Sequence, residues 1–231
     1  MIAYLVRHAE SLSNVKQAES LNDGLTDLGE RQVEALARRL SGVAVRAIYS
    51  SPFRRALDTA LPLADVCGQP VFLRPELCEH HHLSEGTEVD IELATVEEIT
   101  RRDTRLMPCP DHAGSFDWVP VDESFMRLVA RVQSFAGFLK KRWPADEDAV
   151  VVVSHGSPIA RLIEAWLTDE PGPSFRFIID NAAINGVRYH EEISSLVCLN
   201  EVSHLAGLPA PASANYRGDG SIKTVPALSY W

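Results

Sequence analysis

Two uninterrupted apolar runs, at residues 2–6 and 150–153, constrain the fold of this 231-residue chain more than any other feature. The second run reads "VVVV", and both runs have the length of a strand rather than of a helix. A strand without polar positions has to be covered on both faces, as the strands of a parallel sheet are. The two runs therefore predict a sheet that lies between layers of helices.

Helical patterns lie between and after these runs. The stretch "LTDLGERQVEALARRLSG" has apolar residues at helical spacing, acids in its first turn and a glycine just past its end, and Thr26 is its expected N-cap. Two later helices are expected to begin with Ser51 as the N-cap and Pro52 in the first turn, and with Ser157 and Pro158 in the same roles.

Hydrophobic periodicity also predicts helices and strands in the rest of the chain. Helical periodicity is present near residues 89–104 and 121–142. Further strands, of which the last two are a candidate hairpin, are expected at residues 45–49, 175–179, 184–190 and 195–199.

Strands that alternate with helices favour an α/β fold, here a three-layer α/β/α sandwich with a mostly parallel central sheet. We expect residues 1–231 to form a single catalytic domain. It would include a helical insertion at about residues 80–147 and an irregular tail, rich in Pro, Gly, Ala and Ser, at about residues 207–231.

The composition excludes several classes of partner. The formal net charge of −10 would repel nucleic acid and anionic membrane surfaces, and no apolar segment has the length of a membrane span or a signal peptide. A small anionic substrate stays compatible with this charge if Arg and His residues cluster locally. The cysteines have no spacing typical of a zinc site or a disulfide framework and indicate a cytoplasmic protein with reduced thiols at Cys67, Cys78, Cys109 and Cys198.

Three of the predicted strands end in residues that bind anions or transfer protons. These are Arg7-His8, Ser50-Ser51 leading into Arg54-Arg55, and Ser154-His155-Gly156. Ligands of α/β sheets bind at the carboxyl ends of the strands, so neighbouring strands would bring these groups together. Arginine forks match phosphate oxygens, and the helices that follow present free N–H groups to the same region. The chemistry that this cluster suits best is phosphoryl transfer.

Within this cluster His8 is the candidate nucleophile. Positive charge from Arg7 disfavours protonation of the imidazole and leaves a ring nitrogen free to attack phosphorus. The departing alkoxide needs a proton, and a carboxylic acid could supply it. Glu79 and Glu10 are both candidates for this acid on position alone.

These residues carry a resemblance to a known family. "RHAESLSN" resembles the Arg-His-Gly-Glu-Ser/Thr-x-x-Asn signature of the histidine phosphatase superfamily, branch 1, also called the phosphoglycerate mutase-like group. Other segments of the chain are similar to further family motifs, in the same order: "GLTDLGERQ", "SSPFRRALDTA", "LCE", "VVVSHGSPIARLI" and, more weakly, "NAAI". The resemblance implies a phosphoglycerate mutase-like α/β fold.

The resemblance also implies a role for each matching residue. His8 would become a phosphohistidine, while Arg7, Arg55 and His155 hold the transferring oxygens and Glu79 donates the proton. Asn14 would line the phosphate pocket, and Gly156 is included among the phosphate-binding residues. No metal or cofactor is expected, because the Arg and His cluster supplies the charge stabilisation.

Some positions depart from the family pattern. Ala9 replaces a glycine and requires a negative φ, and His80 stands where the mutases tend to have Arg. The run at residues 80–82 is all histidine, but consecutive residues rarely direct three imidazoles to one metal ion, so substrate contact or exposure is favoured.

Three functions remain open at this point. The leading hypothesis is a metal-independent phosphatase acting on a small phosphorylated metabolite. A mutase of the phosphoglycerate type is the second, and a non-catalytic module that binds phosphate ligands is the third. The segment that would decide the substrate, residues 80–147, has no secure match. A homodimer is compatible with the sequence, which does not specify the oligomeric state.

Overall fold

The computed structural model describes residues 1–80, 95–108, 123–168 and 177–209. Its centre is a seven-stranded mixed sheet with the order β4-β3-β2-β5-β1-β6-β7. The first five strands of this order are parallel, whereas β6 and β7 run antiparallel to their neighbours. The strands are β1 (Ile2–Arg7), β2 (Val45–Ser50), β3 (Val71–Leu73), β4 (Leu106–Pro108), β5 (Ala149–Ser154), β6 (Ile184–His190) and β7 (Ile193–Glu201).

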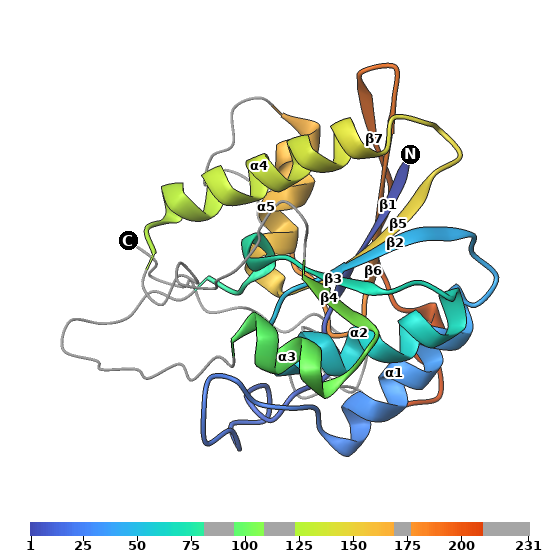
Figure 1. The fold of residues 1–231 in the computed structure, drawn as a ribbon. Helices are drawn as coiled ribbons and strands as arrows, with labels where there is room; N and C mark the ends of the chain where they lie inside the picture. Colours follow the sequence, from blue (N-terminus) through green and yellow to red (C-terminus); the bar gives the residue numbers. More distant parts are fainter. Residues whose placement is uncertain (81–94, 109–122, 169–176, 210–231) are drawn as a thin grey trace.

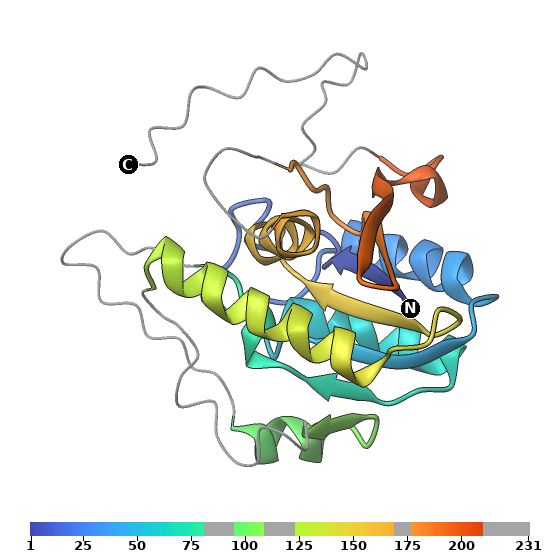
Figure 2. The same ribbon diagram turned by 90° about the horizontal axis from the view of Figure 1, so that it is seen from above.

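Helices cover both faces of the sheet, which gives three layers (Figures 1 and 2). One layer contains α1 (Asp27–Leu40), α2 (Arg54–Cys67) and α3 (Val96–Arg102). The other contains α4 (Phe125–Arg142) and α5 (Gly156–Leu167). Two short 3-10 helices, η1 (Pro75–Leu77) and η2 (Ser203–Leu205), complete the described elements.

The strand β5 shows why the sheet needs both layers. Val150 and Val152 belong to the core formed with α4 and α5, whereas Val151 and Val153 belong to the core formed with α1 and α2. All four side chains are fully buried. Because successive side chains of a strand point to opposite faces, an unbroken valine run can be buried only in the middle layer.

The α/β class, the mostly parallel sheet and the run-based strands are confirmed. The β6–β7 hairpin is also confirmed, since both strands pair antiparallel along their length. Thr26 caps α1 as expected, because its Oγ1 accepts a hydrogen bond of 3.0 Å from the Gly29 N–H. Local patterns were sufficient for these elements.

The predicted starts of two helices are wrong. The helix α2 begins at Arg54 with Phe53 as N-cap, not with Ser51, whose hydroxyl instead faces the functional site. The helix α5 begins at Gly156 with His155 as N-cap, not with Ser157. Ser51 is used for the site rather than for capping, whereas Ser157 lies inside α5 and is exposed.

Other boundaries also differ from the expectation. Residues 177–179 form no strand, and residues 175–176 lie outside the described part. The segments at 89–104 and 121–142 are helical only at 96–102 and 125–142, while residues 89–94 and 121–122 lie outside the described residues. The short strands β3 and β4 were missed, because three residues carry too little periodicity.

The segment expected as an insertion is part of the sandwich where it is described. It supplies β4, which pairs with β3 at the sheet edge, and α4, which packs on one face. Of the expected irregular tail, only residues 207–209 are described, and they lie outside helices and strands. Among the described helices, none combines the length and the apolar character that crossing a membrane requires.

Candidate active site

The polar residues expected to converge lie together at the carboxyl ends of three adjacent strands. In the parallel pairing, Arg7 of β1 is opposite Ser154 of β5, and Ser50 of β2 is opposite Val153. His8, Ser51 and His155 therefore follow directly from neighbouring strands. The His8 N–H donates to the Ser154 carbonyl at 2.9 Å, which ties the first of these loops to β5.

The two site histidines are in ring contact. Their centroids are 5.0 Å apart in an edge-on arrangement, and the Phe53 ring lies 5.4 Å from that of His155. The Arg55 guanidinium in turn lies over the Phe53 ring, 4.8 Å from its centroid. His155 Nε2 is 2.9 Å from the Ser51 hydroxyl, so this ring is held from β2 as well as from β5.

The tautomer of His8 follows from its hydrogen bond. Its Nδ1 lies 2.7 Å from the Ala9 carbonyl oxygen, which can only accept, so Nδ1 carries the proton. Burial holds the pKa of His8 well below its ordinary value, and the positive charges of Arg55 and Arg7 lower it further. The imidazole is therefore neutral at neutral pH, with its lone pair on Nε2, the state that a nucleophile requires.

Arg7 has donor capacity left in a buried position. Its Nη1 donates to the Ile179 carbonyl at 2.6 Å, whereas its buried Nε has no partner among the described residues. Burial lowers the pKa of Arg7 from its ordinary value, and the nearby carboxylates of Glu79 and Asp180 act in the opposite direction. A buried guanidinium with an unused N–H is suited to an anion that arrives from solution.

Arg55 is held in place by residues from the loop before α1. Its Nη1 donates to Asp23 Oδ1 at 2.8 Å and to the Leu21 carbonyl at 2.7 Å. These bonds use Nη1 alone and fix the guanidinium plane beside His8. Thr59 reinforces the arrangement, because its hydroxyl donates to the Arg55 carbonyl and accepts from the Ala9 N–H.

Asn14 is joined to His8 by Asn181, a residue that is not among the predicted site residues. Asn14 Oδ1 accepts from the Ser11 N–H and from Asn181 Nδ2, both at 3.0 Å. Asn181 Nδ2 also donates to the His8 carbonyl at 3.0 Å. The only signal for Asn181 in the sequence was the weak match of "NAAI".

The residue after Asn181 has a strained backbone. Ala182 is fully buried with a φ of 56°, in the left-handed region that favours glycine. Its N–H approaches the carbonyls of Arg7 and His8 at 3.1 and 3.3 Å. Strain of this kind persists where surrounding contacts demand it, and here the contacts are those with the chain at Arg7 and His8. By contrast, Ala9 lies outside the positive-φ region, as its replacement of glycine requires.

The structure separates the two candidate acids. Glu10 is buried, and its Oε1 accepts from the Thr26 hydroxyl at 2.9 Å, so its carboxylate lies at the start of α1. Glu79 is partly exposed and close enough to Arg7 to influence its charge. The geometry therefore favours Glu79 as the acid in the site.

Gly156 and His80 also occupy defined places. Gly156 is the first residue of α5, and a Cβ there would be 3.9 Å from Arg7, an ordinary contact, so the site does not require glycine for space. His80 donates from Nε2 to the Glu123 carbonyl at 3.0 Å, a protein contact rather than a metal site. His81 and His82 lie outside the described residues.

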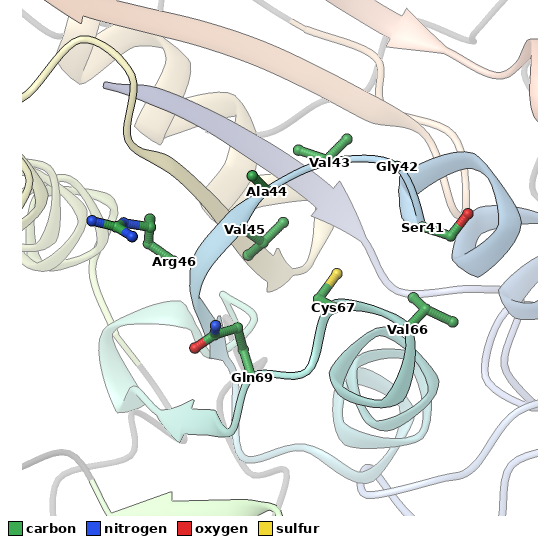
Figure 3. Close-up of a pocket in the computed structure, with 9 residues that line it drawn as sticks. All are labelled: Ser41, Gly42, Val43, Ala44, Val45, Arg46, Val66, Cys67 and Gln69. Atoms are coloured by element: carbon green, nitrogen blue, oxygen red, sulfur yellow. The ribbon is translucent and has the colours of Figure 1, made fainter.

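A hollow of about 410 Å³ lies at the other end of the sheet (Figure 3). It is formed by the chain from Ser41 to Arg46, which leads into β2, and by Val66, Cys67 and Gln69 at the end of α2. The amino end of β2 is opposite to the end that carries Ser51. This hollow is therefore separate from the histidine site.

Comparison with known proteins places this geometry in a family. Residues 3–202 match the model of the histidine phosphatase superfamily (branch 1). The chain is 31% identical over 204 residues to phosphoserine phosphatase 1 of Hydrogenobacter thermophilus, which covers 87% of this chain and 92% of that protein. It is 27% identical over 213 residues to a probable phosphoglycerate mutase, GpmB, of Yersinia enterocolitica, with 90% of this chain and 95% of that protein covered.

The fold gives the same grouping. A mycobacterial glucosyl-3-phosphoglycerate phosphatase, solved as a complex with VO3, superposes with a TM-score of 0.65 at 26% identity. The match covers 87% of this chain and 99% of that chain.

Proposed function

The chain belongs to the histidine phosphatase superfamily (branch 1), and from that premise we propose that it is a phosphomonoester hydrolase whose nucleophile is His8. The observation that carries the proposal is the state of the His8 ring. A carbonyl fixes the proton on Nδ1, and burial between two guanidinium groups keeps the ring neutral, so Nε2 is available to attack phosphorus.

The first step forms a phosphohistidine. The lone pair of His8 Nε2 attacks phosphorus, the bond from phosphorus to the ester oxygen breaks, and Glu79 gives its proton to the departing alkoxide. Arg7, Arg55 and His155 hold the oxygens of the transferring group, with Asn14 and Gly156 at the edge of the same pocket. Preorganised donors of this kind stabilise the charge that develops in the transition state.

The second step regenerates the enzyme. Water attacks phosphorus, its proton passes to the Glu79 carboxylate, and the bond between phosphorus and Nε2 breaks to release inorganic phosphate. The same residue acts first as an acid and then as a base. The positive charge that phosphoryl transfer needs comes from the chain's own Arg and His residues, so the proposal includes no metal and no cofactor.

The proposed substrate is a small phosphorylated metabolite. The curated relatives named above include a phosphoserine phosphatase and a probable phosphoglycerate mutase, so hydrolysis and phosphoryl transfer between hydroxyl groups are the two alternatives. A mutase has to keep water away from the phosphohistidine. Incubation with a bisphosphoglycerate and a phosphoglycerate separates them, because isomer exchange without phosphate release would contradict the hydrolase proposal. A non-catalytic binding module is disfavoured by the presence of all five catalytic candidates.

The test of the nucleophile is His8→Ala. We expect turnover of 4-nitrophenyl phosphate and acid-labile phosphate on the quenched protein to disappear, because the substitution removes the ring nitrogen that is proposed to attack phosphorus. Inorganic phosphate should still raise the melting temperature of the variant, since the arginines remain. His190→Ala, which changes an exposed histidine at the far end of β6, is the matched control and should keep wild-type activity. A His8→Ala variant with near-normal turnover would reject the assignment.

We also propose a single cytoplasmic domain that forms a homodimer. Cys67, Cys78 and Cys198 are free thiols, which supports a reducing compartment.

For the dimer, β7 is the last strand at one edge of the sheet and exposes four apolar side chains, those of Ile193, Leu196, Val197 and Leu199. Antiparallel pairing of two β7 strands would satisfy the open edge, place these apolar side chains beside those of the partner strand and close the assembly with two-fold symmetry.

A further inference from the structure

Two buried ion pairs, which the mechanism above does not use, adjoin the loop that carries Glu79. Arg74 donates from Nε and Nη2 to the two carboxylate oxygens of Glu76, at 3.1 and 2.5 Å. Arg131 of α4 donates from Nε to both oxygens of Glu123, at 2.9 and 3.0 Å, and its Nη2 also binds this carboxylate. All four side chains are buried. We call these four residues the loop network.

Stability alone is a poor explanation for such a network. Removing four charges from water is costly, and apolar residues of similar volume often serve a core at least as well. The Arg74 guanidinium stacks on the Phe138 ring, 4.2 Å from its centroid, so the network is built into the packing of α4. A better explanation is that the charged groups fix the position of the neighbouring backbone.

The loop network forms hydrogen bonds with both ends of the loop of residues 76–80. Arg131 Nη1 donates to the Glu76 carbonyl at 2.5 Å. At the other end, His80 Nε2 donates to the carbonyl of Glu123, the partner of Arg131, at 3.0 Å. The Arg131–Glu123 pair, at and just before α4, therefore binds the residues on either side of the stretch that contains Glu79.

The middle of the loop is fixed from the active site itself. The Ser154 hydroxyl, next to His155, donates to the Leu77 carbonyl at 2.7 Å. Cys78 is fully buried beside Ser51, and burial raises the pKa of its thiol to about 12, so it serves packing rather than chemistry. The Glu79 carboxylate is close enough to Arg7 to raise the pKa of that guanidinium, and its Oε1 accepts from the His80 N–H at 2.9 Å.

We infer that Arg131 and Glu123 are positioning residues that hold the Glu79 carboxylate toward the departing oxygen of the substrate. The inference rests on the proposed function, because it assigns a purpose to the loop only if Glu79 is the proton donor. The two residues touch no substrate. They act by fixing the backbone on both sides of Glu79 before substrate binds, and a proton donor is effective only when it is held within hydrogen-bond reach.

The test compares two aryl esters that differ only in a para-nitro group, phenyl phosphate and 4-nitrophenyl phosphate. Phenolate is the poorer leaving group and depends on protonation, whereas nitrophenolate departs with little help. The variant is the double change Arg131→Met and Glu123→Leu, which removes both charges together and leaves neither buried alone. The matched control is Arg161→Met with Glu164→Leu, which removes a second buried pair, on α5, whose charged atoms lie 2.6 Å apart.

We expect the double variant to lower kcat/KM for phenyl phosphate by about tenfold more than for 4-nitrophenyl phosphate, as partial loss of a general acid would. Glu79→Gln should show the same selective loss, and adding the double variant to it should change the ratio no further. The control pair should leave the ratio at the wild-type value. His80→Ala, which alters no buried charge, should shift the ratio in the same direction and decides the matter if the double variant fails to fold.

The positioning role is overturned if the folded double variant keeps the wild-type ratio of kcat/KM for the two esters. If the double variant does not fold, the same result in His80→Ala overturns it. Failure of the proposed function is seen separately in the wild-type protein. Absence of phosphate on His8 after acid quenching would reject the mechanism as a whole. Phosphate on His8 together with an unchanged ratio would reject only the role of Arg131 and Glu123.

Discussion

At the scale of single residues, the environment of His8 is the most consequential feature. The ring is almost fully buried, so its protonated form would lose its hydration, and two guanidinium groups add repulsion. Binding of a phosphate dianion would offset the charge of the two guanidinium groups, while the Ala9 carbonyl continues to hold the ring proton on Nδ1. The site is thus arranged to keep His8 unprotonated where a free histidine would begin to take up a proton.

This arrangement predicts a pH dependence of stability. The folded-state pKa of His8 is below the unfolded value of about 6.5, so only the unfolded chain takes up this proton as the pH falls through that value. The free energy of unfolding of the wild type therefore falls as the pH drops below about 6.5. The contribution of His8 to this fall is up to about 1.4 kcal/mol for each pH unit.

Urea unfolding at a series of pH values from about 7.5 to 5.5 measures the effect. His8→Gln should lose less stability than the wild type over this range, because glutamine does not titrate. His204, whose pKa is also lowered by burial, is present in both proteins and cancels in the difference. Parallel curves for the two proteins would contradict the depressed pKa of His8.

At the scale of elements, the loop after β1 and the start of α1 are packed backbone to backbone. Gly29 lies in the first turn of α1, and a Cβ built on it would be only 2.0 Å from the Glu10 carbonyl oxygen. That same oxygen accepts from the Thr26 N–H at 3.0 Å. Only glycine at position 29 lets the backbone of α1 come this close to the Glu10 carbonyl. This contact sets where α1 lies relative to His8.

Two glycine substitutions test this packing. Gly29→Ala should destabilise the protein by about 1–3 kcal/mol, as overpacking does, and should reduce activity because the loop of His8 has to move. Gly137→Ala is the matched control in the middle of α4, where a Cβ would meet nothing within 4 Å. It should raise stability by about 0.5–1 kcal/mol through helix propensity. Denaturation midpoints for the two variants that move in the same direction would contradict this account.

At the scale of the whole molecule, the functional site and the proposed dimer surface use different parts of one sheet. The site lies at the carboxyl ends of the central strands β2, β5 and β1, whereas β7 is at the edge. Dimerisation through β7 would therefore extend the sheet without entering the pocket. Association and catalysis should be separable by mutation.

The substitution Val197→Lys tests the dimer. It places a charge among the exposed apolar residues of β7 and should convert a dimer to a monomer in light scattering, with activity retained. Val66→Lys is the matched control, since Val66 is similarly exposed on α2 and lies away from this edge. A wild-type protein that is monomeric at micromolar concentration would reject the proposed dimer.

Local patterns in the sequence were enough for most elements and for much of the site. Unbroken apolar runs identified β1 and β5, the Thr26 cap and helical spacing identified α1, and the residues that follow the strands led to His8 and His155. These features were accessible because strand period, helix period and capping depend on neighbours within a few residues. The gathering of the strand ends then followed from the geometry of parallel sheets.

Only the tertiary structure decided how these residues are partnered. It directed Glu10 to the start of α1 and left Glu79 in the site, fixed the proton of His8 on Nδ1, and brought Asn181 to the carbonyl of His8. It also joined Arg131 to Glu76, residues separated by 55 positions along the chain. Contacts of this kind depend on which distant segments pack together, and local sequence patterns do not specify that packing.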